Sequence, residues 1–181
     1  MILIRRASPE DAAGIARVHV ESWRSTYAGI VPQAYLDGLS EWQRAERWRE
    51  ALRRDDEVFV AEQDGQTVGF VMGGPSRDGV EDCDAELYAI YILAEVQKAG
   101  VGTDLLHELA RSLCESGFAS MDVWVLDANP AKRFYERMGA HRAGAKEIEI
   151  GGATLLKRAY VWPDLKALAA RSLCAEVGSN R

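Results

Sequence analysis

The sequence has few of the features that mark disulfide-rich, membrane or secreted proteins. Its 181 residues include only three cysteines, and this odd, scattered set (Cys83, Cys114 and Cys174) fits a reducing compartment better than a disulfide framework. No apolar run has the length that a membrane-spanning helix needs, so we expect no membrane partner. Arginines follow a very short apolar stretch at the N-terminus, an order that does not fit a signal peptide. We therefore expect a cytoplasmic protein.

The sequence also has no excess of basic over acidic residues. The chain has 22 lysines and arginines against 28 aspartates and glutamates, which gives a formal net charge of -6. Binding to a phosphate backbone needs a basic face, so we expect no nucleic-acid partner. A negative charge instead favours cationic small substrates.

Several catalytic signatures are absent as well. His19, His107 and His141 are too scattered for a metal site, and no cysteine pair has the spacing of metal ligands. We expect His19, on an apolar helix face, to be a packing residue whose polar atoms are satisfied. No serine lies in a Gly-x-Ser-x-Gly turn, and neither Cys83 nor Cys114 belongs to a nucleophile motif. A covalent acyl-enzyme is therefore not expected.

The composition supports one globular domain, because 48% of the residues are hydrophobic and 28% are charged. Asp64-Gly65 and Gly151-Gly152 each separate two strand-like segments and predict two hairpins. Ser8, Ser40 and Gly117 fit the ends of helices. The expected strands cover residues 2–7, 57–63, 66–74, 85–93, 120–127, 141–150 and 153–162, and the helices cover 9–25, 33–39, 40–53, 100–116 and 130–139. This alternation indicates a mixed sheet in a layered α+β or α/β fold.

The segment QKAGVG, residues 97–102, forms a glycine-rich turn between an expected strand and an expected helix. A P-loop needs Gly-Lys-Ser/Thr at its end, and a dinucleotide fingerprint needs a third glycine where Leu105 stands, so both are excluded. The pattern Gln/Arg-x-x-Gly-x-Gly/Ala remains, with Gln97, Gly100 and Gly102 in its defined positions. Glycines and helix N-terminal amides suit a pyrophosphate, although a plain strand-to-helix turn has the same glycines.

A second motif follows in the segment NPAKRFYERMG, residues 129–139. Together with the glycine turn, this motif resembles the GNAT superfamily of acetyl-CoA-dependent N-acetyltransferases. The resemblance covers residues 2–162 and is most specific over residues 86–139. It implies a mostly antiparallel, twisted sheet of about seven strands that splay apart between the fourth and fifth, flanked by helices. Residues 1–163 would form the acetyltransferase domain and residues 164–181 a C-terminal helical tail.

The resemblance also implies where acetyl-CoA binds as cosubstrate, with no metal. Strand-four backbone groups would pair with the pantetheine arm, as in β-augmentation. Asn129 would contact the cofactor arm, although an asparagine here also suits a turn or helix cap. Lys98 and Lys132 would add positive charge near the phosphates, and Lys98 is equally consistent with a solvated turn. The expected cofactor-binding residues are Ile90, Tyr91, Ile92, Gln97, Lys98, Ala99, Gly100, Val101, Gly102, Thr103, Asn129 and Lys132.

Two residues match catalytic positions of the family. Tyr135 matches the general acid that protonates the leaving thiolate, and its alternative role is to pack a helix onto the sheet. Glu86 matches a strand-four glutamate that takes the amine proton, directly or through water, and its alternative is a solvated strand end. Trp23, Tyr27 and Tyr160 are candidate walls of the substrate site or ordinary packing aromatics.

The expected function is transfer of an acetyl group from acetyl-CoA to a primary amine of a small molecule or peptide, in a ternary complex. The alternatives are a non-catalytic acetyl-CoA-binding regulatory module and a structural domain that matches the motifs by accident. The acceptor amine has no readable code, because acceptor recognition lies in loops. A homodimer is common among related proteins.

Overall fold

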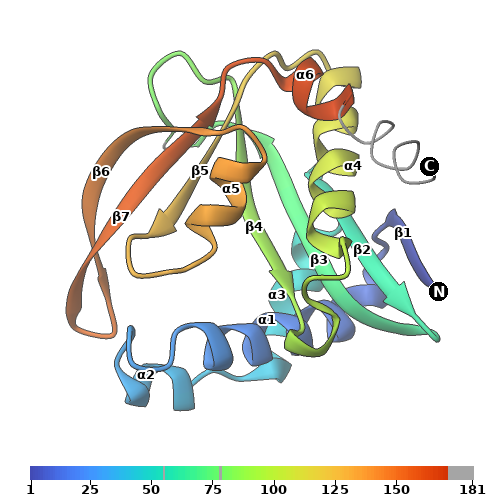
Figure 1. The fold of residues 1–181 in the computed structure, drawn as a ribbon. Coiled ribbons are helices and arrows are strands. Elements are labelled where there is room, and N and C mark those ends of the chain that lie inside the picture. The colour runs from blue at the N-terminus through green and yellow to red at the C-terminus, as the bar shows by residue number, and fades with distance from the viewer. Residues whose placement is uncertain (55, 78, 171–181) are drawn as a thin grey trace, which may run out of the picture.

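A computed structural model describes residues 1–54, 56–77 and 79–170 of the chain. One seven-stranded sheet runs through it in the order β1-β2-β3-β4-β5-β7-β6, as Figure 1 shows. The strands are β1 (Ile2–Arg6), β2 (Glu57–Gln63), β3 (Gln66–Pro75), β4 (Ala85–Ile92), β5 (Met121–Leu126), β6 (His141–Ile150) and β7 (Ala153–Trp162). Only the β4–β5 pair is parallel, and the other pairs are antiparallel. The predicted layered, mixed sheet is confirmed.

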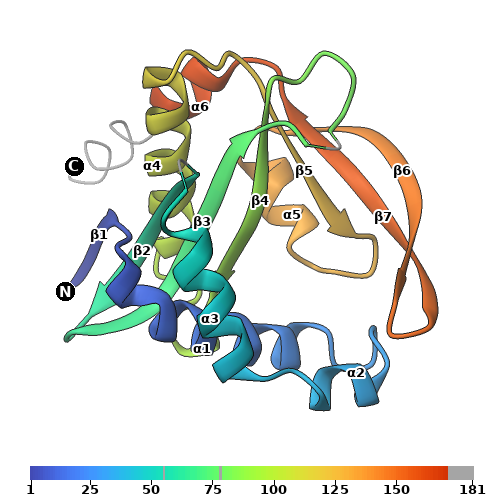
Figure 2. The same cartoon turned by 180° about the vertical axis from the view of Figure 1, so that it is seen from behind.

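The helices cover both faces of the sheet. Figure 2 shows α1 and α3 on one face, and α4 and α5 lie on the other face in Figure 1. The α-helices are α1 (Ala12–Thr26), α2 (Gln33–Asp37), α3 (Glu41–Ala51), α4 (Val101–Glu115), α5 (Lys132–Arg137) and α6 (Leu165–Ala170). Two short 3-10 helices, η1 (Pro9–Asp11) and η2 (Ala94–Val96), precede α1 and α4.

Local sequence signals explain where these elements begin and end. The Ser40 side chain accepts a hydrogen bond from the Gln43 amide at 3.3 Å and so caps α3. Asp64 and Gly65 both have positive φ, as a two-residue hairpin turn between β2 and β3 requires. Gly117 has φ 94° just after α4, in the left-handed conformation typical of a residue after a helix end.

The main core joins residues of α1 and α3 on one face of the sheet with residues of α4 on the other. Four leucines of α4 at helical spacing have no exposed surface, and they pack with β2, β3 and β4. The leucines are Leu105, Leu106, Leu109 and Leu113. Leu165 and Leu168 of α6 join the same core, so the first part of the segment expected as a tail is packed against the domain. The rest of that segment, residues 171–181 with Cys174, lies outside the described residues.

The strands β4 and β5 pair over a short distance and then separate. Their parallel pairing is limited to three positions, Ala85 with Met121, Glu86 with Asp122 and Leu87 with Val123. Beyond Leu87, β4 pairs only with β3, and the β3–β4 register shifts at Tyr88 in a β-bulge. Backbone groups on the inner edge of β4 therefore lack a strand partner, as expected for the splayed sheet.

Candidate active site

A cavity of about 700 Å³ lies where β4 and β5 separate. Its wall comes from the end of α1, the inner edges of β4 and β5, the turn before α4, and the segment that leads into α5. Eleven of the residues singled out in the sequence contribute to this wall: Tyr27, Ile90, Tyr91, Ile92, Gln97, Lys98, Gly100, Gly102, Thr103, Asn129 and Tyr135. The fold therefore brings two motifs and the end of the first helix to one place.

The glycine turn brings the first residues of α4 to the cavity wall, where Gly102 and Thr103 line it. Lys98 and Gly100 have φ values of 65° and 86°, which turn the chain sharply before α4 begins at Val101. The Gln97 side chain donates a hydrogen bond to the Ile92 carbonyl at 3.0 Å and holds the turn against the end of β4. A Cβ at Gly102 would lie 2.9 Å from the Ile92 side chain, so only glycine fits there without displacement. The arrangement is a helix N-terminus facing an open slot, which suits an anion.

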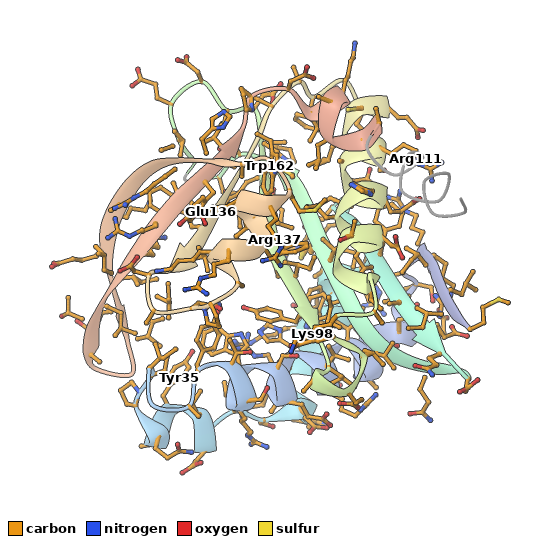
Figure 3. All side chains as sticks on the ribbon, in the orientation of Figure 1. Tyr35, Lys98, Arg111, Glu136, Arg137 and Trp162 are labelled. Carbon is orange, nitrogen blue, oxygen red and sulfur yellow. The ribbon has the colours of Figure 1, made fainter. Side chains whose placement is uncertain are left out.

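The basic residues are distributed differently from the expectation. Lys132 does not line the cavity, because its ammonium donates to the Asp127 carbonyl at 2.6 Å and lies 3.4 Å from the Asp127 carboxylate, which also pairs with Arg158. Arg137, which sequence reasoning missed, does line the cavity. Figure 3 shows Arg137 on the α4 side of α5 and Lys98 at the turn that enters α4.

Tyr135 lies in the cavity wall with its ring held by neighbours. It is 5% exposed and contacts the rings of Phe134, Tyr160 and Trp162. Among the described residues, its hydroxyl has no hydrogen-bond partner. Burial first, and then the charge of Tyr27, raises the pKa of Tyr135 well above its usual value. The group is therefore a neutral phenol that can donate a hydrogen bond to a molecule in the cavity.

Tyr27 and Asn129 make a direct contact across the cavity. The Asn129 side-chain amide donates a hydrogen bond to the Tyr27 hydroxyl at 3.1 Å, although the two residues are 102 positions apart. The Asn129 side-chain oxygen accepts from the Ala131 amide at 2.9 Å. Asn129 therefore forms a turn just before α5 and a bridge to the end of α1. A turn role was one of the alternatives seen in the sequence, and the bridge was not expected.

Tyr91 and His19 form part of an aromatic cluster beside the cavity. Their rings stack with centroids 5.2 Å apart, and His19 also contacts the rings of Trp48 and Phe70. Burial and the charge of Arg44 lower the pKa of His19 to about 3. Its Nδ1 atom is buried without a hydrogen-bond partner, so the expectation of a satisfied packing residue was wrong in this respect. The side chain packs as expected, but burying the ring with an unpaired nitrogen costs free energy of folding.

Glu86 lies near this cavity but not in its wall. Its carboxylate accepts a hydrogen bond from the Arg77 amide at 3.0 Å, and it pairs in register with Asp122 across the β4–β5 junction. Tyr88, two positions further along β4, does line the cavity, and the Arg77 guanidinium lies 3.5 Å from the Tyr88 ring centroid. Asp122 was not singled out from the sequence, because a single acidic residue in a strand carries no motif.

The other expected site residues lie outside the cavity wall. Tyr160 is buried and donates to the Glu136 carboxylate at 3.2 Å, and Trp23 packs against Tyr27 with ring centroids 4.7 Å apart. Ala99, in the turn, and Val101, the first residue of α4, do not line the cavity. A search of the described residues finds no group of three or more His, Cys, Asp or Glu side chains placed to hold a metal ion. It also finds no helix there that is long and apolar enough to cross a bilayer.

Comparisons with known proteins agree with this geometry. A family model of the acetyltransferase (GNAT) domain matches residues 54–139. YuaI of Bacillus subtilis, an uncharacterized N-acetyltransferase, is 42% identical over 169 residues, which cover 93% of this chain and 96% of YuaI. The chain belongs to the GNAT family of N-acetyltransferases.

Other members of the GNAT family show what the same fold accommodates. The spermidine N(1)-acetyltransferase of Thermoplasma acidophilum is 28% identical over 76% of this chain and 87% of that enzyme. The solved structure of a paia N-acetyltransferase from Thermoplasma acidophilum, in complex with coenzyme A, has a TM-score of 0.66 at 24% identity. The match covers 87% of this chain and 98% of that chain, so the two proteins share a fold over most of this chain. As a member of the family that the family model and YuaI identify, the protein is an acetyltransferase.

Proposed function

We propose that this GNAT protein transfers an acetyl group from acetyl-CoA to a primary amine of a small molecule or peptide, by direct attack in a ternary complex. The observation that carries the proposal is the cavity at the β4–β5 separation, because it joins an anion-binding turn, an unpaired strand edge and a buried phenol. Coenzyme A has a pyrophosphate, an amide-bearing arm and a sulfur in the same linear order. The paia structure contains coenzyme A on a related fold, which supports this choice of cosubstrate.

The residues fit that cosubstrate from one end to the other. Residues 97–103, with the first amides of α4, face the pyrophosphate, and Lys98 adds a positive charge there. Arg137 replaces Lys132 as the second cation for the phosphates, because Lys132 is held by Asp127. The unpaired backbone of Ile90, Tyr91 and Ile92 pairs with the amides of the arm.

Bound acetyl-CoA would supply an activated acetyl thioester, and the protein supplies orientation and proton transfer. Tyr135 donates its phenolic proton to the sulfur that leaves when the C–S bond breaks. Glu86 receives the proton that the amine loses as its nitrogen bonds to the acetyl carbon. Since Glu86 lies outside the cavity wall, we expect water to carry that proton past Tyr88. Holding both reactants in one cavity supplies proximity.

The identity of the amine acceptor cannot be taken over from the relatives. The Thermoplasma relative is named for spermidine, but acceptor recognition generally lies in loops, so this substrate does not carry over. On this side of the cavity, Ser22, Thr26 and Tyr27 form the wall in this protein. A cytoplasmic location and a homodimer remain predictions.

The test is a thiol-release assay with acetyl-CoA over a library of amines, combined with calorimetric titration of acetyl-CoA. Micromolar binding and turnover with at least one amine class are expected. Binding without turnover for any amine would indicate a regulatory acetyl-CoA-binding module instead. Absence of acetyl-CoA binding would contradict the proposal as a whole.

A further inference from the structure

A continuous run of hydrogen bonds leads from the end of α1 to Tyr135. The Asn129 side-chain amide donates to the Tyr27 hydroxyl, and the Asn129 side-chain oxygen accepts from the Ala131 amide. The Ala131 carbonyl then accepts from the Tyr135 amide at 3.3 Å. The run joins the acceptor side of the cavity to the helix that carries the proposed general acid.

The direction of each hydrogen bond in this run is determined by its neighbours. The Ala131 amide can only donate, so the Asn129 atom that faces it is the oxygen, and the atom that faces Tyr27 is the nitrogen. The Tyr27 hydroxyl must then accept this bond. Burial raises the pKa of Tyr27, which keeps the phenol neutral.

The Tyr27 end of the run is firmly held. Tyr27 follows the last residue of α1, its amide donates to the Trp23 carbonyl, and its carbonyl accepts from the amides of Ile30 and Val31. Its ring is 6% exposed and packs on Trp23. The hydroxyl is therefore a fixed point on the scaffold.

The Tyr135 end has little stability of its own. The helix α5 has six residues, and a helix of that length is not stable without tertiary contacts. The residue just before it, Ala131, is held by one side chain, that of Asn129, which accepts a hydrogen bond from the Ala131 amide in a turn. Asn129 is 5% exposed, so its amide nitrogen needs a partner inside the protein, and Tyr27 is that partner.

We propose that Tyr27 is a positioning residue for acetyl transfer, which holds the phenol of Tyr135 in place through Asn129 and the first turn of α5. The inference rests on the proposed role of Tyr135 as general acid. Loss of the Tyr27 hydroxyl leaves a buried amide unpaired and loosens α5, so Tyr135 is presented less accurately to the leaving sulfur.

Kinetics of Tyr27→Phe in two backgrounds tests the catalytic part. In the wild-type background we expect kcat to fall about 10- to 100-fold, with a much smaller change in KM for acetyl-CoA. In the Tyr135→Phe background we expect the added loss to be less than about twofold, because Tyr27 acts through a group that is already absent. Tyr35→Phe is the matched control, since Tyr35 contacts Trp23 from α2, away from α5 in Figure 3.

Amide hydrogen exchange of the protein without ligands tests the structural part independently of activity. In Tyr27→Phe, the amides of residues 131–135 should exchange about tenfold faster or more, whereas those of α4 should be unchanged. Tyr35→Phe should leave both segments as in the wild type. This measurement does not depend on which substrate the enzyme uses.

The outcomes separate this inference from the proposed function. Equal losses of kcat in both backgrounds, or unchanged exchange in α5, would show that Tyr27 does not act through Tyr135 and would overturn the inference. If Tyr135→Phe alone kept full activity, the acid role itself would fail, and the catalytic part of the inference with it. Faster exchange in α5 would then still establish that Tyr27 holds this helix.

Discussion

Glu86 and Asp122 stand side by side on two parallel strands, in the short stretch where β4 and β5 still pair. Asp122 is completely buried, and one of its oxygens accepts from the Val80 amide, while the other has no hydrogen-bond partner among the described residues. Burial first, and the charge of Glu86 second, raise the pKa of Asp122 to about 6. Next to the proposed base, the fold therefore keeps a carboxyl group that resists ionisation.

This pair predicts a pH-dependent stability that Asp122→Asn removes. Because the folded pKa of Asp122 is above its unfolded value, its stabilising effect is complete below about pH 4 and is lost as the pH rises through about 6. In unfolding titrations with urea between pH 4.5 and 8, the free energy of unfolding of the variant should rise relative to that of the wild type with increasing pH, by about 2 kcal/mol. A difference that stays constant across this range would contradict the raised pKa.

Glu86→Gln should lower kcat by about 10²-fold at pH 7, because the amine then lacks a proton acceptor. The deficit should shrink toward pH 9–10, where more of an amine with a pKa of about 10.4 is already neutral. Steady-state rates across pH would show this convergence. Glu81→Gln, at an exposed position in the β3–β4 loop, is the control. Equal kcat for Glu86→Gln and wild type at pH 7 would remove Glu86 from the mechanism.

Tyr135→Phe should lower kcat by about 10²-fold or more while acetyl-CoA binding stays nearly unchanged. The hydroxyl makes no hydrogen bond to the described residues, so its removal should cost little stability. Single-turnover rates and calorimetric binding of acetyl-CoA would measure the two effects separately. A variant with wild-type kcat would leave Tyr135 a packing residue.

Arg137→Gln should raise KM for acetyl-CoA severalfold, and more at low salt, because it removes a cation from the cavity wall. Lys132→Gln is the matched comparison and should have a smaller effect, since Lys132 is bound to Asp127. KM measured at two ionic strengths for both variants would decide the matter. A larger rise in KM for Lys132→Gln than for Arg137→Gln would indicate that Lys132 is the cation that binds the phosphates.

Gly102→Ala and Gly100→Ala should separate cofactor binding from stability. Alanine favours a helix over glycine, so Gly102→Ala should not lower Tm, but its Cβ pushes on Ile92 and should weaken acetyl-CoA binding. Gly100 has φ 86°, and no atom lies within 4 Å of the place that a Cβ would take, so Gly100→Ala should lower Tm through backbone strain alone. Thermal unfolding and calorimetry of both variants test this contrast, and equal effects would contradict it.

Much of the fold could be predicted because its signals are local. Four leucines at helical spacing mark the buried face of α4, and Asp64-Gly65 marks a hairpin within two residues. Part of the cavity wall could also be predicted, because the residues of both motifs lie next to the strands that they end and the helices that they begin. Family resemblance, more than periodicity, joined the glycine turn with Tyr135.

The features that sequence did not reveal depend on contacts between distant segments. The Tyr27–Asn129 hydrogen bond links residues 102 apart, and nothing in either segment encodes the other. Arg137 and not Lys132 lines the cavity because of where α5 lies and because the Asp127 carbonyl binds the Lys132 ammonium. Asp122 is inaccessible because the β3–β4 loop covers it, and strand alternation gives no information about a covering loop.

Because β4 and β5 pair over only a short stretch, the rest of β4 is an unpaired strand edge in the middle of the sheet. An edge with unpaired donors and acceptors invites other extended chains, and proteins usually hide such edges. In the proposed complex, the cosubstrate takes the place of the missing neighbour along β4. The sheet would then be continuous only while acetyl-CoA is bound, so resistance to aggregation and proteolysis would rise and fall with the supply of acetyl groups.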